Sequence, residues 1–165
     1  MTGVQTCALP IYLCFTAFPF TTACIENGYK NIVVNGKARK QYIDNAIKPF
    51  VKRYKGNEII FAFDIMNEPE SDIAGNHGNW TKKGCTWDQM RTFIRENAKA
   101  VHDIDPTRLV SCGSGWHAQE NVQLGLFSRL GLDFYDYHEY RDDGFIPPVS
   151  SLNVDKPVII GEDRK

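Results

Sequence analysis

Residues 58–66 read EIIFAFDIM and are followed directly by Asn67, Glu68 and Pro69. The run is apolar apart from its first residue and Asp64, which is typical of a strand that is buried on both faces. The polar residues and the proline that follow it end the strand, because proline cannot donate a hydrogen bond to a neighbouring strand. The stretch predicts a central strand of a parallel sheet, with an amide and a carboxylate at its carboxyl end.

Further short apolar runs along the chain predict four more strands, at residues 12–18, 108–112, 133–140 and 157–161. Amphipathic runs of helical length lie between strands, at residues 41–54, 86–104 and 119–130. Thr86 stands three residues before Gln89, the spacing of a capping box, and Pro49 is expected to bend the first helix. Strands that alternate with helices indicate an α/β fold with a parallel sheet and crossover helices.

Four of the predicted strands lead into polar residues: Asn67 and Glu68, residues 114–116, residues 138–140, and Glu162. In a (β/α)8 barrel the carboxyl ends of the strands meet on one face, where the active site lies. The two glutamates are the pair of carboxylates that glycoside hydrolysis requires. A separation of about 5 to 5.5 Å would indicate a retaining enzyme, and one of roughly 6.5 to 9.5 Å an inverting enzyme.

Three segments, FAFDIMNEPE (61–70), DFYDYHEY (133–140) and PVIIGE (157–162), resemble the strand-four, strand-six and strand-seven motifs of glycoside hydrolase family 5, in the clan A barrels. The resemblance covers residues 12–162. It implies a (β/α)8 TIM barrel that is incomplete, with about strands three to seven present. It also implies a retaining hydrolase that cleaves β-1,4-linked polysaccharide, either mannan or a cellulose-like chain, by double displacement.

The resemblance also implies a role for each matching residue. Glu68 would be the general acid/base and Glu162 the nucleophile. Asn67 would bond the 2-hydroxyl of the sugar in subsite −1. His138 and Tyr140 match the family's pair that orients the carboxylates and the sugar.

Several of these residues also have structural readings. Trp116 is a candidate platform for stacking a sugar ring, although an aromatic side chain at a strand end also serves as hydrophobic filling. His138 could be a core histidine and Tyr140 could simply pack. Ser114 lies between two glycines but lacks the glycine spacing of a nucleophile elbow, so we do not expect it to be a nucleophile.

The sequence also departs from the family pattern. Family members usually carry an Arg at the end of strand two, a His near strand three and a Trp at the end of strand eight, and no residue here matches them. A whole barrel needs about 250 residues, so we expect the 165 residues to form a fragment that is itself inactive. A carbohydrate-binding barrel without catalysis stays open as an alternative. A barrel isomerase or aldolase would need a phosphate-binding loop late in the sequence or a Lys at the end of a strand, and the sequence shows neither.

The composition of the chain limits which partners and cofactors we expect. The 19 basic and 20 acidic residues are mixed along the chain and give a net charge of −1, so we expect no nucleic-acid or membrane surface. The five cysteines form no CxxC pair, and no two histidines have the spacing of ligands on one helix face. We therefore expect no metal and no cofactor. The expected partner is a polysaccharide or oligosaccharide, bound by a protein that is monomeric when complete.

The two ends of the chain read differently from the rest. Residues 1–11, MTGVQTCALPI, look like translated sequencing adapter, and residues 163–165 look like a similar tail. Residues 12–162 are then the partial catalytic barrel. No apolar run reaches the roughly 18 to 20 residues of a membrane span. We expect the full-length protein to be extracellular, because its substrate would be a polymer.

Overall fold

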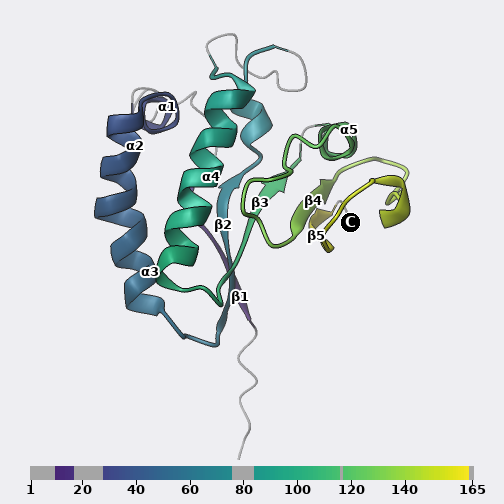
Figure 1. Cartoon of the computed structure of the whole chain (residues 1–165). Coiled ribbons are helices and arrows are strands. Elements are labelled where there is room, and N and C mark those ends of the chain that lie inside the picture. Colours follow the sequence, from purple (N-terminus) through teal and green to yellow (C-terminus); the bar gives the residue numbers. More distant parts are fainter. Residues whose placement is uncertain (1–9, 17–27, 76–83, 116, 164–165) are drawn as a thin grey trace, which may run out of the picture.

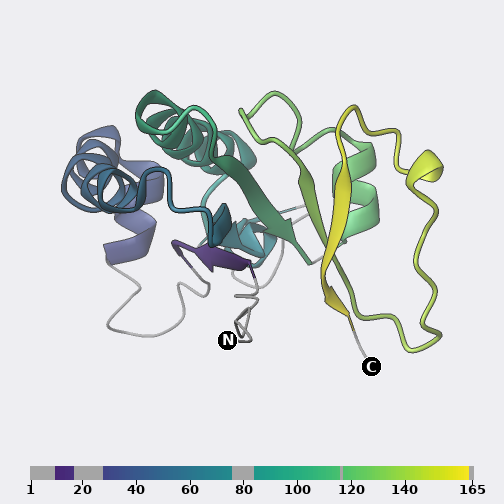
Figure 2. The ribbon, with the colours of Figure 1, turned by 90° about the horizontal axis from the view of Figure 1, so that it is seen from below.

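The computed structural model describes residues 10–16, 28–75, 84–115 and 117–163. Within these residues five strands form one sheet: β1 (Ile11–Cys14), β2 (Ile60–Asn67), β3 (Leu109–Ser114), β4 (Tyr135–Glu139) and β5 (Val158–Asp163). The spatial order is β1-β2-β3-β4-β5 and all neighbours are parallel. This confirms the number of predicted strands and the parallel sheet, although β1 ends at Cys14, short of the predicted range 12–18, of which residues 17–18 lie outside the described residues. Figure 2 shows the sheet as an open, curved wall rather than a closed ring.

Helices α1 to α4 lie together on one side of this sheet (Figure 1). The helical segments are α1 (Gly28–Val34), α2 (Gly36–Tyr42), α3 (Lys48–Tyr54), α4 (Trp87–Ile104) and α5 (Ala118–Gln123), with a π turn at Ile43–Ile47 and 3-10 turns at Pro69–Asp72 and Val149–Ser151. In the described part of the chain, no helix combines the length and the apolar character that a bilayer crossing needs.

The irregularity that we expected at Pro49 takes the form of the π turn. Pro49 lies in the first turn of α3, directly after the π turn, and a proline has no N–H to donate to the helix. The Lys48 N–H donates to the carbonyl of Ile43, five residues earlier, instead of four. The helix therefore continues from Gly36 to Tyr54 through one widened turn.

The prediction of a helix over residues 119–130 was wrong in length, because α5 ends at Gln123. Gly125 and Arg129 both have positive φ angles, 71° and 59°, which a right-handed helix cannot contain. The Arg91 guanidinium donates to the carbonyls of Gly125 and Ser128, each at 3.1 Å. These contacts hold the segment as a series of turns against α4.

The apolar core lies between the sheet and the helices. Phe63 of β2 contacts Phe15 and Phe50, with ring centroids 4.8 and 5.8 Å away. Phe63 and Phe93 of α4 are both 1% exposed. The capping box at Thr86 and Gln89 is present, so α4 begins where the sequence predicted.

The opposite face of the sheet is polar near its centre. In-register partners in a parallel sheet direct their side chains to the same face. Cys14 of β1 is in register with Asp64 of β2, and Asp64 with Ser111 of β3; Gly113 of β3 is in register with Asp136 of β4. In a (β/α)8 barrel this inner face is covered by the remaining strands. On the inner face of the described sheet, buried polar side chains therefore lie in the direction of the carboxyl ends of the strands.

Candidate active site

An open cleft of about 740 Å³ lies at the carboxyl ends of β2, β4 and β5. Its walls come from those strand ends and from the beginning of α5. The lining residues are Asn67, Glu68, Gly115, His117 to Glu120, Tyr137 to Arg141, and Glu162. The carboxyl ends of the strands are where the sequence placed the site.

Five of the six predicted site residues line this one cleft: Asn67, Glu68, His138, Tyr140 and Glu162. The sixth, Trp116, lies outside the described residues. Asn67 closes strand β2 directly before Glu68. Residues that are far apart in the chain are thus neighbours, because parallel strands end at the same edge of the sheet.

Glu68 has a left-handed backbone conformation, with φ 46° and ψ 58°. For a residue other than glycine this conformation costs roughly 1 to 3 kcal/mol, and the surrounding structure must hold it. The Glu68 N–H donates to the Gly113 carbonyl at 2.9 Å, and the Glu68 carbonyl accepts from the Ser71 N–H and hydroxyl. A Cβ on Gly115 would lie 2.0 Å from the Glu68 Oε1 atom. The glycine therefore leaves the space that the carboxylate occupies.

His138 connects the two glutamates. Its Nδ1 atom lies 3.0 Å from Oε1 of Glu68 and 3.9 Å from Oε2 of Glu162. One carboxylate oxygen of each glutamate and a ring nitrogen of His138 all lie within 4.8 Å of one another. The His138 side chain is 2% exposed and that of Glu162 is 44% exposed. The imidazole therefore forms the buried floor under a pair of carboxylates that reach into the cleft.

The surroundings of His138 favour its charged form. Burial alone would lower the pKa of His138, but the Asp136 carboxylate 3.7 Å from Nε2, the hydrogen bond with Glu68 and the charge of Glu162 outweigh it and raise the pKa to about 10. An imidazolium donates from both ring nitrogens. Glu68, His138 and Glu162 also present three atoms of the kind that ligate a metal ion. Here, however, the Nδ1 atom of His138 is already engaged with Glu68, as in an acid–base pair.

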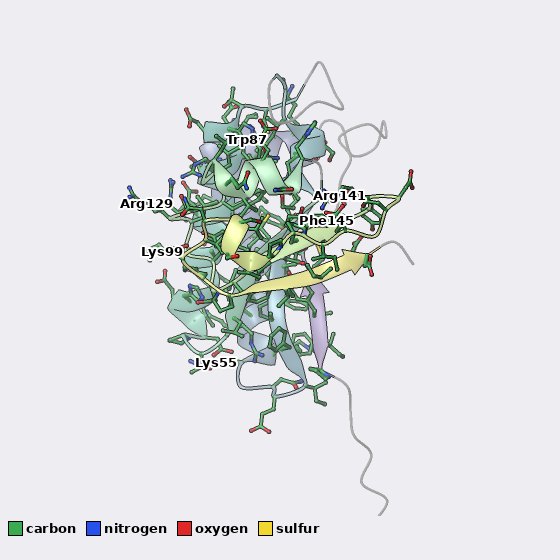
Figure 3. The ribbon with its side chains drawn as sticks, turned by 90° about the vertical axis from the view of Figure 1, so that its right-hand side faces the viewer. Lys55, Trp87, Lys99, Arg129, Arg141 and Phe145 are labelled. Carbon is green, nitrogen blue, oxygen red and sulfur yellow. The ribbon has the colours of Figure 1, made fainter. Side chains whose placement is uncertain are left out.

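Tyr140 holds the other carboxylate. Its hydroxyl donates to Oε2 of Glu162, and this hydrogen bond, with burial and the charge of Glu162, raises the pKa of Tyr140 to about 12. The phenol is therefore a neutral donor at ordinary pH. The next residue, Arg141, lies over the Phe145 ring at 4.5 Å, and Figure 3 shows the two side chains together on the loop after β4.

Sequence comparison identifies the family. The family model described as Cellulase (glycosyl hydrolase family 5) matches residues 24–162. The chain belongs to glycosyl hydrolase family 5. The match spans β2 to β5 as far as Glu162 and so includes every strand end that lines the cleft.

This family 5 chain is similar to two curated animal proteins named mannan endo-1,4-beta-mannosidase. It is 24% identical to the one from Mytilus edulis, over 79% of this chain and 46% of that protein. It is 25% identical to the one from Cryptopygus antarcticus, over 83% of this chain and 46% of that protein. The chain thus spans about half the length of these curated relatives.

Solved structures support the fold. The X-ray structure of the beta-mannanase from Mytilus edulis superposes with a TM-score of 0.74 at 20% identity, and covers 92% of this family 5 chain and 53% of the mussel chain. The five parallel strands are accordingly part of a (β/α)8 barrel. The incomplete barrel predicted from the sequence is confirmed.

Sequence reasoning missed two buried acids in this family 5 chain. Glu70 is fully buried and accepts a hydrogen bond from the Ser114 hydroxyl, and burial raises its pKa to about 7. This engagement of Ser114, which is 1% exposed, agrees with its exclusion as a nucleophile. Asp136 lies below His138 at 2% exposure. Strand alternation could have found Asp136, because residues two apart on a strand share a face.

Proposed function

We propose that this chain carries the catalytic cleft of a retaining glycoside hydrolase that cleaves β-1,4-linked mannan. The observation that carries the proposal is the approach of Glu68 and Glu162, which present carboxylate oxygens within 4.8 Å of each other in one open cleft. Retaining enzymes place their two carboxyl groups about 5 to 5.5 Å apart, whereas inverting enzymes leave room for a water. The short approach supports double displacement.

Glu162 is the proposed nucleophile. It is the more exposed of the two carboxylates, and Tyr140 fixes one of its oxygens. In the first step its other oxygen forms a bond to the anomeric carbon, while the bond from that carbon to the leaving oxygen breaks. Glu68 donates its proton to that leaving oxygen. The product of this step is a glycosyl ester on Glu162 and a free reducing-end segment of the polymer.

Glu68 then acts as the base. It takes a proton from a water molecule, whose oxygen attacks the anomeric carbon and displaces Glu162, so that two inversions give overall retention. His138 donates to Glu68 in its carboxylate form and lies 3.9 Å from Glu162. A cationic imidazole can therefore offset the negative charge that moves between the two glutamates during the cycle.

The names of the relatives support mannan rather than cellulose as the polymer. A polymeric substrate also supports an extracellular site of action for the full-length protein. We expect the five-strand chain itself to be inactive on polymer or nearly so, because the strands that close the rest of the barrel wall are needed to hold the site rigid. A carbohydrate-binding barrel without catalysis is less well supported, since both carboxylates meet in the cleft.

Covalent trapping tests the mechanism without requiring efficient turnover. A 2-deoxy-2-fluoro-mannosyl fluoride should form a stable ester, because its fluorine slows both steps while its reactive leaving group lets the first proceed. We expect intact-mass and peptide analysis to find one label, on Glu162. Glu162→Gln should remove the label. Glu68→Gln should still accept it, because fluoride leaves without a proton.

Two outcomes would contradict the proposal. One is a label that persists in Glu162→Gln. The other is a first-formed product of inverted anomeric configuration, as read by NMR during hydrolysis of an activated β-mannoside.

A further inference from the structure

A buried acid lies directly below the imidazole of His138. Asp136 stands two residues earlier on β4, so both side chains face the inside of the sheet. Its Oδ2 atom lies 3.7 Å from Nε2 of His138, and both side chains are 2% exposed. The Tyr12 hydroxyl of β1 donates to the same oxygen at 2.8 Å. Tyr12, Asp136 and His138 thus form a continuous series of contacts, which runs from β1 to β4 and ends at Glu68.

The neighbouring strand is shaped to admit Asp136. A Cβ on Gly161 of β5 would lie 2.0 Å from Oδ1 of Asp136 and 2.8 Å from Oδ2. Any larger residue at that position would displace the carboxylate. Gly113 of β3 does the same for His138, since a Cβ there would lie 2.9 Å from Nε2. Two glycines therefore clear the space in which the acid and the imidazole meet.

We propose that Asp136 is a positioning residue of this site that acts through His138, fixing the imidazole with Nδ1 towards the two glutamates and keeping it cationic. The inference deepens the proposed hydrolysis and rests on it for the roles of Glu68 and Glu162. Asp136 itself lies below the cleft and touches no substrate in this scheme.

The chemistry of histidine explains why such a partner is needed. A buried imidazole without a neighbouring anion loses its proton, because desolvation disfavours the charged form. Neutral histidine carries one N–H, and in the tautomer with hydrogen on Nε2 the Nδ1 atom cannot donate to Glu68. A carboxylate at Nε2 favours the doubly protonated ring. The Nδ1–H can then donate to Glu68 in the stages of the cycle in which Glu68 is a carboxylate, after it has given its proton to the leaving oxygen.

The other charged groups around His138 are consistent with this assignment. Glu68 and Glu162 face it from the ends of β2 and β5, and Gly113 of β3 lies against its ring. Asp64 of β2 lies on the same inner face; burial, and then the charge of Asp136, raise its pKa to about 7. Burial and the charges of Asp64 and Asp136 raise the pKa of Tyr12, so its hydroxyl stays a neutral donor. The imidazolium is therefore the cation that these inward-facing acids share.

The test is an NMR titration of the ring nitrogens of His138 in the full chain, with His138→Gln used to assign the signals. We expect the wild-type ring to stay doubly protonated up to about pH 9. Asp136→Asn keeps an acceptor for Tyr12 but removes the charge, and should lower the midpoint by two pH units or more. Asp136→Glu restores the charge and should recover part of the shift. Tyr12→Phe, which leaves the carboxylate in place, should change the midpoint much less.

The rate of covalent labelling by the fluorosugar adds a second readout that needs no turnover. Asp136→Asn should lower the maximal labelling rate by at least about tenfold with little change in the half-saturating concentration, as expected when the acid that orients a histidine is neutralised. In a His138→Gln background the same change should cost nothing further. Equal losses in both backgrounds, or an unchanged His138 midpoint in Asp136→Asn, would overturn the proposal.

The two proposals can fail separately. If Asp136→Asn does not fold, as judged by circular dichroism, the wild-type titration still decides, since a His138 that is neutral below pH 8 contradicts the role of Asp136. The titration needs no substrate, so it remains readable if hydrolysis is disproved. The fluorosugar label on Glu162 likewise remains readable if Asp136 proves inert.

Discussion

Glu70 shows how burial changes the behaviour of a single acid next to the cleft. Its side chain is fully buried, one oxygen accepts from Ser114, and the other has no hydrogen-bond partner among the described residues. Burial raises its pKa from 4.5 to about 7. The folded state therefore holds the Glu70 proton more tightly than the unfolded state does, and the stability linked to this proton is lost as pH rises.

We predict that the free energy of unfolding falls between about pH 5 and pH 8, as Glu70 and Asp64 lose their protons in the folded state. The stability linked to Glu70 is fully present below about pH 4.5 and disappears as pH passes through about 7. Each unit of pKa difference corresponds to about 1.4 kcal/mol. Glu70→Gln stays neutral at every pH, so its decline should be shallower. Urea denaturation across this range measures both.

The matched control is Glu58→Gln, a change of an exposed glutamate just before β2. It should leave the pH dependence of the wild type unchanged. A Glu70→Gln variant whose stability declines as steeply as that of the wild type would show that Glu70 is not the group that titrates.

At the scale of elements, helix α4 depends on its first turn. The Thr86 hydroxyl accepts from the Gln89 N–H, and the Gln89 side chain accepts from the Thr86 N–H. We predict that Thr86→Ala lowers the free energy of unfolding by about 1 kcal/mol, because it leaves an N–H of the first turn without its partner. Thermal or urea unfolding measures the loss.

Thr92→Ala is the control on the same helix. The Thr92 hydroxyl donates to the Asp88 carbonyl within the helix, a bond that adds little to helix stability. Alanine there should be neutral or slightly stabilising, since it has the higher helix propensity. Equal losses at both positions would mean that the capping box contributes nothing beyond the side-chain volume.

The same elements explain which predictions could be made from the sequence. Strands β2 and β4 and the start of α4 were predictable, because apolar runs and a capping box are local signals. The short α5 was not, since the turns after it depend on Arg91 of a distant helix. The strand-end residues of the site follow from the convergence of parallel strands. Glu70 could not be predicted, because its role comes from burial, which the sequence does not display; Asp136 could have been predicted from its place two residues before His138 on the same strand.

At the scale of the whole molecule, the two candidate carboxylates belong to strands that differ in how many neighbouring strands they pair with. β2 is paired on both sides, whereas β5 is paired only with β4 among the described residues. Backbone N–H groups without a strand partner exchange with solvent readily. We predict that the amides of β5 lose protection from hydrogen exchange well before those of β2, as measured by exchange of the full chain. Equal protection would indicate that another part of the chain covers the β5 edge.

The order of the strands also has a consequence for biosynthesis. Each of β2 to β5 pairs with the strand that precedes it in the chain, so each of these strands finds a partner already made when it leaves the ribosome. The ribosome makes the chain from its amino terminus at about 5 to 20 residues per second. The wall that carries Glu68 can therefore assemble while Glu162 is still untranslated. The cleft gains its second carboxylate only when β5 docks, after the sheet beneath it has been built.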